Sequence, residues 1–383
     1  MMRPPRLLLP ALFLLALSGA LACETRWPHW AAYARHFIQS DGRVIEYSQA
    51  ARSTSEAQAY ALFHALVAND RARFDTLLRW TRDNLARGDL RRHLPAWLWG
   101  RRKDGSWGVL DDNSASDADL WLAYTLIEAG RLWRAPRYAR LGEAVLTNIE
   151  RAEVRALPGL GPMLLPGRRG FEPRDGTWRL NPSYLPLQLL ARLAALRPDG
   201  PWRAIRANTA RLLGEAQRDG VVADWVGWRP GSGFVTLDGR AAVASYDAIR
   251  VYLWLGLLAD DDPLKRPLLA RLRLPACRGP WPPERMHLTS GRREGTGPVG
   301  FKAALLPYVQ ARGDHTCLRR LRAEVAAAWH GELLSEQPRY YDQNLALFSL
   351  GWLEGRYRFD AQGKLHTRWE HPCRPSQELS SSS

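Results

Sequence analysis

Four carboxylates in three short segments have surroundings that suit acid–base chemistry. Asp117 and Asp119 open an apolar stretch with helical spacing, Glu56 follows a Ser-Thr-Ser run, and Asp247 lies three residues before Arg250. Each is expected in the first turn of a helix, where unpaired backbone N–H groups and the positive dipole end favour a carboxylate. One carboxyl group can donate a proton while another activates water, so these residues are candidates for a general acid and a general base.

The first two segments also have a purely structural explanation. Ser114 and Ser116 are suitable N-cap residues, and acids in a first turn stabilise a helix by about 0.3–1 kcal/mol without any chemistry. Ser53 and Glu56 have the spacing of a capping box. From spacing alone, this structural interpretation is favoured for both segments.

The third segment is open to two interpretations. Ser245 can cap a helix that places Asp247 in its first turn, and Asp247 with Arg250 has the spacing of a surface ion pair. Such a pair contributes little to stability. A carboxylate kept ionised by an arginine and a helix start would also suit a general base.

Together the three segments resemble those of glycoside hydrolase family 8, the inverting endoglucanases. Residues 115–119 and 128–133 are similar to the family signature, residues 55–58 resemble the segment that carries the proton donor, and residues 245–250 resemble the segment that carries the base. The resemblance covers nearly the whole chain after its leader. It implies an endo-β-1,4-glucanase on an (α/α)6 barrel, linked to bacterial cellulose biosynthesis and secretion.

The resemblance also assigns roles. It implies Glu56 as general acid, Asp247 as general base and Asp117 as the third catalytic carboxylate. In inverting enzymes the acid and the base stand about 6.5–9.5 Å apart. Asp117 or Asp119 is expected to help Glu56 keep its proton by like-charge repulsion, while the other binds sugar. Ala57 stands where the family usually has glycine, and a methyl group there is expected to lower activity.

Aromatic residues are abundant, with 17 tryptophans in 383 residues. Their rings can stack on the apolar faces of pyranose sugars, although burial in the core explains any single ring about as well. Tyr246 and Arg250 are expected to orient the base. Tyr340 and Tyr341 are expected to close the reducing-end side of the cleft. The expected substrate-binding residues are Asp119, Trp97, Trp99, Trp107, Tyr184, Trp225, Tyr246, Arg250, Tyr340 and Tyr341.

Apolar periodicity predicts about twelve helices in short-spaced pairs. Many have apolar residues on more than one face, which is typical of helices packed on both sides. We therefore predict an all-α fold, the (α/α)6 barrel, with small β-hairpins on the rim near 221–228 and 356–365. The predicted helices span 27–38, 54–69, 71–86, 117–133, 137–153, 183–196, 201–216, 245–258, 263–273, 299–311, 315–329 and 339–354.

The N-terminus has the pattern of a signal peptide. Residues 1–22 contain a basic start, an apolar run and a small-residue cleavage site. Residues 23–373 are expected to form one catalytic domain, and 374–383 a disordered tail. This predicts a periplasmic or secreted enzyme; a lipoprotein modified at Cys23 is the rival interpretation.

The four cysteines are even in number, which favours disulfides in an exported chain. They allow three pairings. We prefer Cys23–Cys373, which would tie the chain ends together, and Cys277–Cys317, which would close a local loop. The resembled enzymes often carry cysteines at both ends.

Other classes of function fit poorly. The formal net charge is +15, but the arginines are scattered, so no nucleic-acid partner is expected. Histidine and cysteine spacing predicts no metal site, and nucleotide motifs are missing, so no cofactor is expected. After the leader, no apolar run is long enough to span a membrane. The expected partner of this monomer is a β-1,4-glucan (cellulose) chain, and docking to the cellulose synthase complex is left open.

Two alternatives remain at this stage. The enzyme could hydrolyse another β-linked polysaccharide, such as chitosan, xylan or mixed-linkage glucan. Alternatively, the chain could be a non-catalytic glucan-binding component of a secretion assembly.

Overall fold

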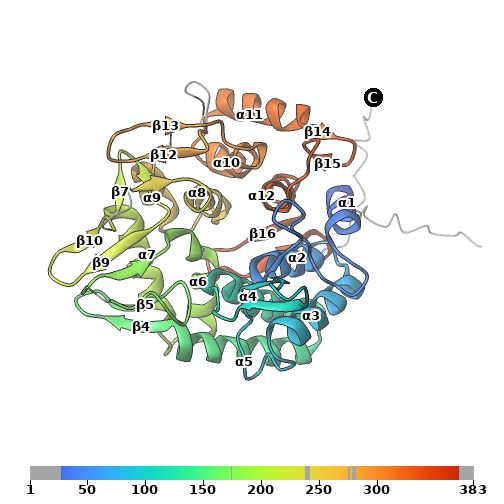
Figure 1. Ribbon diagram of the computed structural model, residues 1–383. Coiled ribbons are helices and arrows are strands. Elements are labelled where there is room, and N and C mark those ends of the chain that lie inside the picture. Colours follow the sequence, from blue (N-terminus) through green and yellow to red (C-terminus); the bar gives the residue numbers. More distant parts are fainter. Residues whose placement is uncertain (1–26, 174, 238–241, 275–276, 278–281, 371–383) are drawn as a thin grey trace, which may run out of the picture.

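The computed structural model describes residues 27–173, 175–237, 242–274, 277 and 282–370 (Figure 1). Within these residues twelve α-helices form, each where apolar periodicity predicts one. They are α1 (Pro28–Phe37), α2 (Ser55–Val67), α3 (Arg71–Leu85), α4 (Ser116–Leu132), α5 (Pro136–Glu153), α6 (Leu187–Leu196), α7 (Trp202–Glu215), α8 (Ala248–Leu257), α9 (Lys265–Arg271), α10 (Val299–Ala311), α11 (His315–Ala327) and α12 (Tyr340–Leu353).

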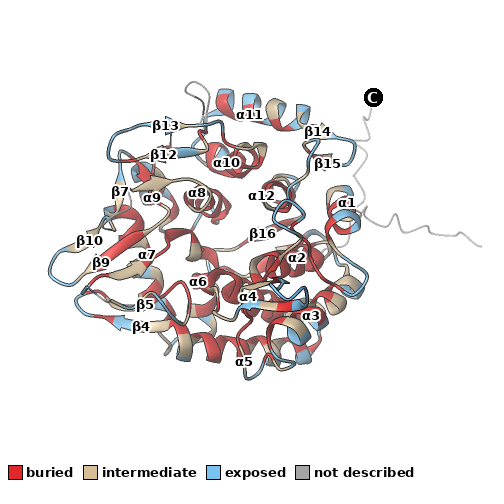
Figure 2. Cartoon of the chain, in the orientation of Figure 1, coloured by how far each residue is buried: buried red, intermediate tan, exposed pale blue. Residues whose placement is uncertain are grey.

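The even-numbered helices form a closed inner ring. Each contacts the next even-numbered helix, and α12 returns to contact α2. The odd-numbered helices pack outside this ring: α3, α5, α7, α9 and α11 each contact the even-numbered helix that precedes them, and α1 contacts α12 (Figure 1). In Figure 2 the inner helices are buried almost throughout, whereas outer helices such as α5 and α11 keep an exposed face. This confirms the predicted (α/α)6 fold and explains the apolar residues on several faces of the inner helices.

An aromatic cluster fills the middle of the ring. Trp121 of α4 lies 4.8 Å from Phe63 of α2, 5.3 Å from Trp254 of α8 and 5.0 Å from Phe348 of α12, between ring centroids. Tyr60 packs edge-on against Trp121 at 6.0 Å. Rings from four inner helices thereby fix the spacing of the helices whose N-terminal ends carry the candidate carboxylates.

One helix begins later in the chain than its apolar pattern predicts. The stretch expected to start at 183 is split into a 3₁₀ turn, η1 (Pro182–Tyr184), and α6, whose N-cap residue is Pro186. Proline sets its own φ and disfavours helical conformation in the residue before it, so the helix begins only after it.

The strands are short and form small antiparallel sheets between the helices. Hairpins lie near both predicted places, while the others span too few residues to show a clear alternation. The strands are β1 (Ser53–Thr54), β2 (Leu98–Arg101), β3 (Trp107–Asp111), β4 (Val154–Leu157), β5 (Gly161–Leu164), β6 (Trp178–Leu180), β7 (Gln217–Arg218), β8 (Val221–Val222), β9 (Val226–Arg229), β10 (Gly233–Val235), β11 (Val243–Ala244), β12 (Arg285–His287), β13 (Arg293–Glu294), β14 (Trp329–His330), β15 (Leu333–Leu334), β16 (Tyr357–Phe359) and β17 (Leu365–Thr367). A second 3₁₀ turn, η2 (Arg368–Glu370), follows β17.

The β16–β17 hairpin packs closely against the inner ring. The hydroxyl of Tyr124 in α4 donates to the carbonyl of Gly363 at 2.8 Å. Gly363 has a φ of +70°, and a Cβ there would lie 1.8 Å from the carbonyl oxygen of Gln188. Only glycine allows the hairpin turn to approach α6 this closely.

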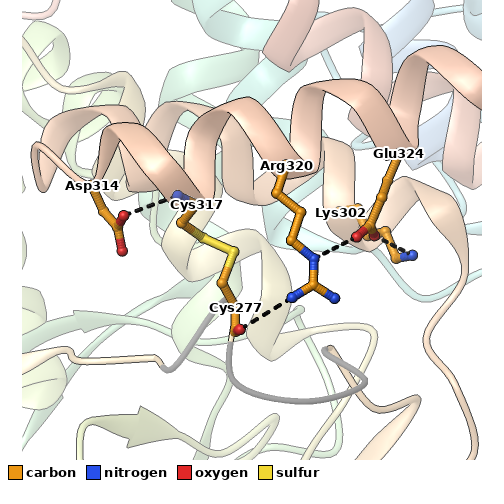
Figure 3. Close-up of a disulfide and its surroundings, with 6 residues drawn as sticks. All are labelled: Cys277, Lys302, Asp314, Cys317, Arg320 and Glu324. Carbon is orange, nitrogen blue, oxygen red and sulfur yellow. Dashed lines mark hydrogen bonds and ion pairs between the residues drawn. A yellow bond between two sulfur atoms is a disulfide. The ribbon is translucent and has the colours of Figure 1, made fainter.

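Cys277 and Cys317 form the predicted disulfide, with their Cα atoms 5.7 Å apart (Figure 3). Arg320 donates to the carbonyl of Cys277 and pairs with Glu324, which also binds Lys302. The bridge therefore joins the segment after α9 to α11. Cys23, Cys373, the predicted leader and the predicted tail lie outside the described residues.

Among the helices that the structure describes, none combines the length and apolarity needed to cross a membrane.

The close contact of α4 with α5 generates a stability prediction. A Cβ at Gly130 would lie 2.6 Å from both the Cβ and the backbone nitrogen of Ala139. We expect Gly130→Ala to lower the free energy of unfolding by about 1–3 kcal/mol, because the helices must move apart. Gly214→Ala is the matched control, since its Cβ would meet only the flexible end of Arg271 at 3.2 Å. Urea denaturation measures both; equal stability of the two variants would contradict the packing argument.

Candidate active site

The N-terminal ends of α2, α4, α8 and α12 meet at one groove of about 380 Å³. It brings together the three candidate catalytic carboxylates and most of the expected substrate-binding side chains. The expected residues that line it are Glu56, Trp97, Asp117, Tyr184, Tyr246, Asp247, Arg250, Tyr340 and Tyr341.

Glu56 is free of any capping role. Thr54 is the N-cap of α2, and its hydroxyl accepts from the backbone N–H of Ala57 at 3.1 Å. The capping box expected from Ser53 is therefore wrong. Instead, Oε1 of Glu56 accepts a 2.8 Å hydrogen bond from Tyr340, and Oε2 binds the guanidinium of Arg250. Ala57 itself is buried behind the acid.

Asp117 lies in the first turn of α4, as predicted, but the expected serine caps are wrong. Ser114 donates its hydroxyl to Glu153 at 2.5 Å, and the hydroxyl of Ser116 is buried without a hydrogen-bond partner among the described residues. Asp117 Oδ1 accepts from the N–H of Ala118 at 2.8 Å, and the residue lines the groove.

Asp247 is the N-cap residue of α8, but another carboxylate caps the helix. Asp224 Oδ1 accepts from the backbone N–H groups of Ser245 and Ala248, each at 2.8 Å. Capping by Ser245 is thus wrong, and its hydroxyl also donates to Asp224. Asp247 keeps its carboxylate in the groove, where Oδ2 accepts from Asn181 at 3.0 Å.

One guanidinium joins the three carboxylates. Arg250 is only 2% exposed, so the surface ion pair is wrong. Its Nη1 donates to Glu56, to Asp117 at 3.0 Å and to the hydroxyl of Tyr60 at 3.0 Å. Its Nη2 donates to Asp247 at 2.6 Å. The cluster thus sets one cation against three acids, which favours retention of a proton.

Asp117 has a raised proton affinity in this cluster. Burial raises its pKa to about 7; Arg250 opposes that shift and the neighbouring Glu56 adds to it. Near neutral pH Asp117 therefore carries a proton for part of the time, which reduces the excess negative charge around Arg250.

Aromatic side chains extend the groove along the β2–β3 hairpin, which follows Trp97. Trp99 and Trp107 stack with ring centroids 5.3 Å apart and an interplanar angle of 20°. The guanidinium of Arg43 lies 4.3 Å and 4.6 Å from their centroids, and Trp107 is 45% exposed. Neither tryptophan lines the central groove itself; they form an exposed aromatic platform beside it.

Trp225 lies in a second hollow of about 280 Å³, which it shares with Asp224 and Ser245. Its ring is parallel to that of Phe171, with centroids 5.9 Å apart, and Tyr184 of the central groove lies 6.2 Å away. Trp225 is thus separated from the carboxylates but near the groove's edge.

The prediction that Asp119 binds sugar is wrong, because its side chain has no exposed surface. Its side chain is fully buried behind the groove and interacts with Glu153 of α5. Because Asp117 and Asp119 are two residues apart on a helix, they point in different directions, and only Asp117 reaches the groove.

Sequence reasoning missed four polar residues of this region: Tyr60, Asn181, Asp224 and Glu153. Each acts on a residue distant in the chain, so no local motif marks it. The Asn181-Pro182 pair is a dipeptide typical of turns, and it is the local signal by which Asn181 could have been noticed.

A helical toroid with a carboxylate-lined groove at one end, walled by tyrosine and tryptophan, defines the class. Cleavage of a glycosidic bond uses a pair of carboxyl groups, and aromatic side chains beside them can stack on the sugar rings. The fold and the site together identify a glycoside hydrolase.

Comparison with known proteins identifies the family. The family model described as glycosyl hydrolases family 8 matches residues 1–355. An endoglucanase of Xanthomonas axonopodis pv. citri is 48% identical over 370 residues, 96% of this chain and 94% of that protein. An endoglucanase of Escherichia coli (strain K12) is 44% identical over 366 residues, 94% and 96% of the two chains. The crystal structure of endo-1,4-D-glucanase from Vibrio fischeri ES114 matches with a TM-score of 0.81 and 40% identity, covering 90% of this chain and 100% of that chain. The chain belongs to glycosyl hydrolase family 8, as the resemblance implied.

The shared guanidinium gives a second prediction. Arg250→Leu leaves Glu56, Asp117 and Asp247 without their common cation. We expect a loss of about 3–5 kcal/mol in the free energy of unfolding, and a smaller loss when Asp117→Asn is already present. Arg211→Ala breaks an exposed pair and should cost less than about 1 kcal/mol. Chemical denaturation of the four variants tests this, and a loss for Arg250→Leu as small as that of the control would disprove the network's importance.

The raised pKa of Asp117 predicts a pH dependence of stability. Its native pKa of about 7 lies above the ordinary 3.8. As the pH rises, the unfolded chain therefore loses this proton at a lower pH than the native protein does. This contribution to stability is fully present below pH 3.8 and is lost as the pH rises through about 7. Melting temperatures measured across this range should fall less steeply for Asp117→Asn than for the parent; parallel curves would refute the assignment.

Proposed function

We propose that this glycoside hydrolase is an endo-β-1,4-glucanase that cleaves cellulose-type β-1,4-glucan with inversion. The observation that carries the proposal is that one buried guanidinium, that of Arg250, holds Glu56 by one nitrogen and Asp247 by the other in a single groove. Relatives over nearly the whole chain are named endoglucanases, which supports the same substrate class.

In this proposal Glu56 is the general acid. It lies in the first turn of α2, and Tyr340 donates to one of its oxygens. When a sugar enters, its glycosidic oxygen would replace one of these partners and receive the proton. Asp117 accepts from the same Nη1 of Arg250 as Glu56 does, so these two carboxyl groups compete for one cation.

Asp247 is proposed as the general base. Its two oxygens are held by different donors, Oδ1 by Arg250 and Oδ2 by Asn181, which fixes the orientation of the carboxylate. Capping of α8 by Asp224 leaves this carboxylate available for water. Inversion follows if that water attacks the face of the sugar opposite the departing oxygen.

The aromatic residues are proposed to bind the glucan chain. Trp97 and Tyr184 lie in the groove with the carboxylates, and Trp99 with Trp107 continues the surface outward. A β-1,4-glucan is a flat ribbon, so its rings can stack on such side chains over several sugar units. This arrangement suits attack within a chain rather than at its end.

Cellular context is proposed on sequence grounds. The leader pattern of residues 1–22 supports export to the periplasm, and the resemblance of the motifs supports a role beside bacterial cellulose synthesis. We propose that the protein acts there as a monomer on the nascent glucan.

The catalytic roles predict matched losses of turnover. Glu56→Gln and Asp247→Asn should each lower the rate on soluble carboxymethylated cellulose by about 10²–10⁴-fold, because each removes proton transfer while keeping side-chain size. Binding of cello-oligosaccharides, measured by calorimetry, should remain. Asp83→Asn, on an exposed ion pair of α3, is the control and should keep full activity.

Near-parental turnover of either catalytic variant would exclude its assigned role. NMR of the first anomer released tests the stereochemistry: an α product from the β-linkage supports inversion, and a β product contradicts it. Release of internal fragments from cellohexaose, rather than of single terminal units, tests the endo mode of cleavage.

A further inference from the structure

Two carboxyl groups behind the groove have no part in the chemistry above. Asp119 lies in the first turn of α4, and Glu153 is the last residue of α5; both are fully buried. The two groups interact with each other across the α4–α5 contact. Within the part of the chain that the structure describes, both oxygens of Asp119 and Oε2 of Glu153 are buried without a geometrically sound hydrogen bond.

Too little positive charge faces this pair to keep both groups ionised. Arg168 is the cation that acts on both, but its guanidinium is bonded to the carbonyl and carboxylate of Asp112. Asp117, which lies nearby in the groove, adds negative charge. Two adjacent buried carboxylates without a cation between them are very costly, so a proton is retained.

The pKa values agree with this geometry. Burial raises the pKa of Glu153 to about 7, against the hydrogen bond from Ser114. Burial, and next the charge of Glu153, raise the pKa of Asp119 well above its ordinary range. The two groups titrate together, so the proton belongs to the pair rather than to one residue.

The pair is also tied to the turn that carries Asp117. Glu153 Oε1 accepts a 2.5 Å hydrogen bond from the hydroxyl of Ser114, three residues before Asp117. The next turn is held by the N–H of Ser116, which donates to the carbonyl of Pro166 at 3.0 Å. Glu153 therefore links the residues just before α4, which lead into Asp117, to the end of α5.

We propose that Asp119 and Glu153 share a proton and act as a positioning pair for Asp117. With the proton in place, the pair presents at most one negative charge and holds Ser114. When the proton is lost, two like charges repel each other and Asp117, and the first turn of α4 loosens. Besides each other, the charged or titratable groups that bear on the pair are Asp117 and Arg168; Asp117 in turn faces Arg250, Glu56 and Asp247.

The shared proton can be tested without substrate, so this test is independent of the proposed endoglucanase function. Infrared difference spectra at pH 7 compare the parent with the Asp119→Asn/Glu153→Gln double variant. We expect the double variant to lose one protonated-carboxyl band, which Glu215→Gln, an exposed control on α7, retains. Identical spectra of parent and double variant in that region would overturn the proposal.

The positioning role rests on the proposed function and is tested by kinetics. Glu153→Gln keeps an oxygen that can accept from Ser114, so its kcat should stay within about threefold of the parent at neutral pH. Glu153→Ala removes that acceptor and should lower kcat about tenfold or more with little change in KM, because Asp117 is displaced rather than lost.

Ser114→Ala removes the same hydrogen bond without replacing a buried acid. It serves as the second test if Glu153→Ala does not fold. It should show the same loss of kcat with an unchanged KM. Unchanged kcat in Ser114→Ala and in Glu153→Ala would refute the positioning role. Absence of glucanase activity in the parent would instead count against the proposed function and leave the infrared result valid.

Discussion

The buried guanidinium of Arg250 is the interaction on which the site depends. It is the cation that Glu56, Asp117 and Asp247 share. These residues belong to α2, α4 and α8, whose N-terminal ends come together only when the ring closes. Burying a charge is costly unless it is paired and hydrogen-bonded, and here the three acids and Tyr60 supply that pairing. The aromatic cluster below fixes the distances between these helices, so packing and electrostatics specify the same geometry.

A second feature is that Glu56 and Asp247 do not cap the helices that they begin. Thr54 caps α2 in place of Glu56, Asp224 caps α8 in place of Asp247, and the turn before α4 is held through Ser114. A carboxylate that accepts hydrogen bonds from several backbone N–H groups has a strongly lowered pKa and is poorly available for proton transfer. Capping from neighbouring segments removes that conflict and leaves the acids facing the groove.

The charge of the site contrasts with that of the whole chain. The formal net charge is +15, yet at the centre of the groove three carboxylates, those of Glu56, Asp117 and Asp247, share the single guanidinium of Arg250. Elsewhere arginines pair with acids of the outer helices, as Arg197 does with Glu143 and Glu150 of α5. Among the buried acids, burial raises the pKa of Asp117, Glu153 and Asp224. Several carboxyl groups in and around the site therefore retain a proton to a higher pH than ordinary aspartate and glutamate side chains do.

The sequence by itself determined the twelve helices, their pairing into a toroid, the family and the segments carrying Glu56, Asp117 and Asp247, because periodicity and motifs are local properties of a chain. It misjudged what is set at a distance: the serine caps at α4 and α8 and the role of Asp119. Only the tertiary structure decided these, since Asp224, Asn181 and Glu153 act across tens of residues. Burial and hydrogen-bond partners arise when separate helices pack together, and no spacing within one segment encodes them.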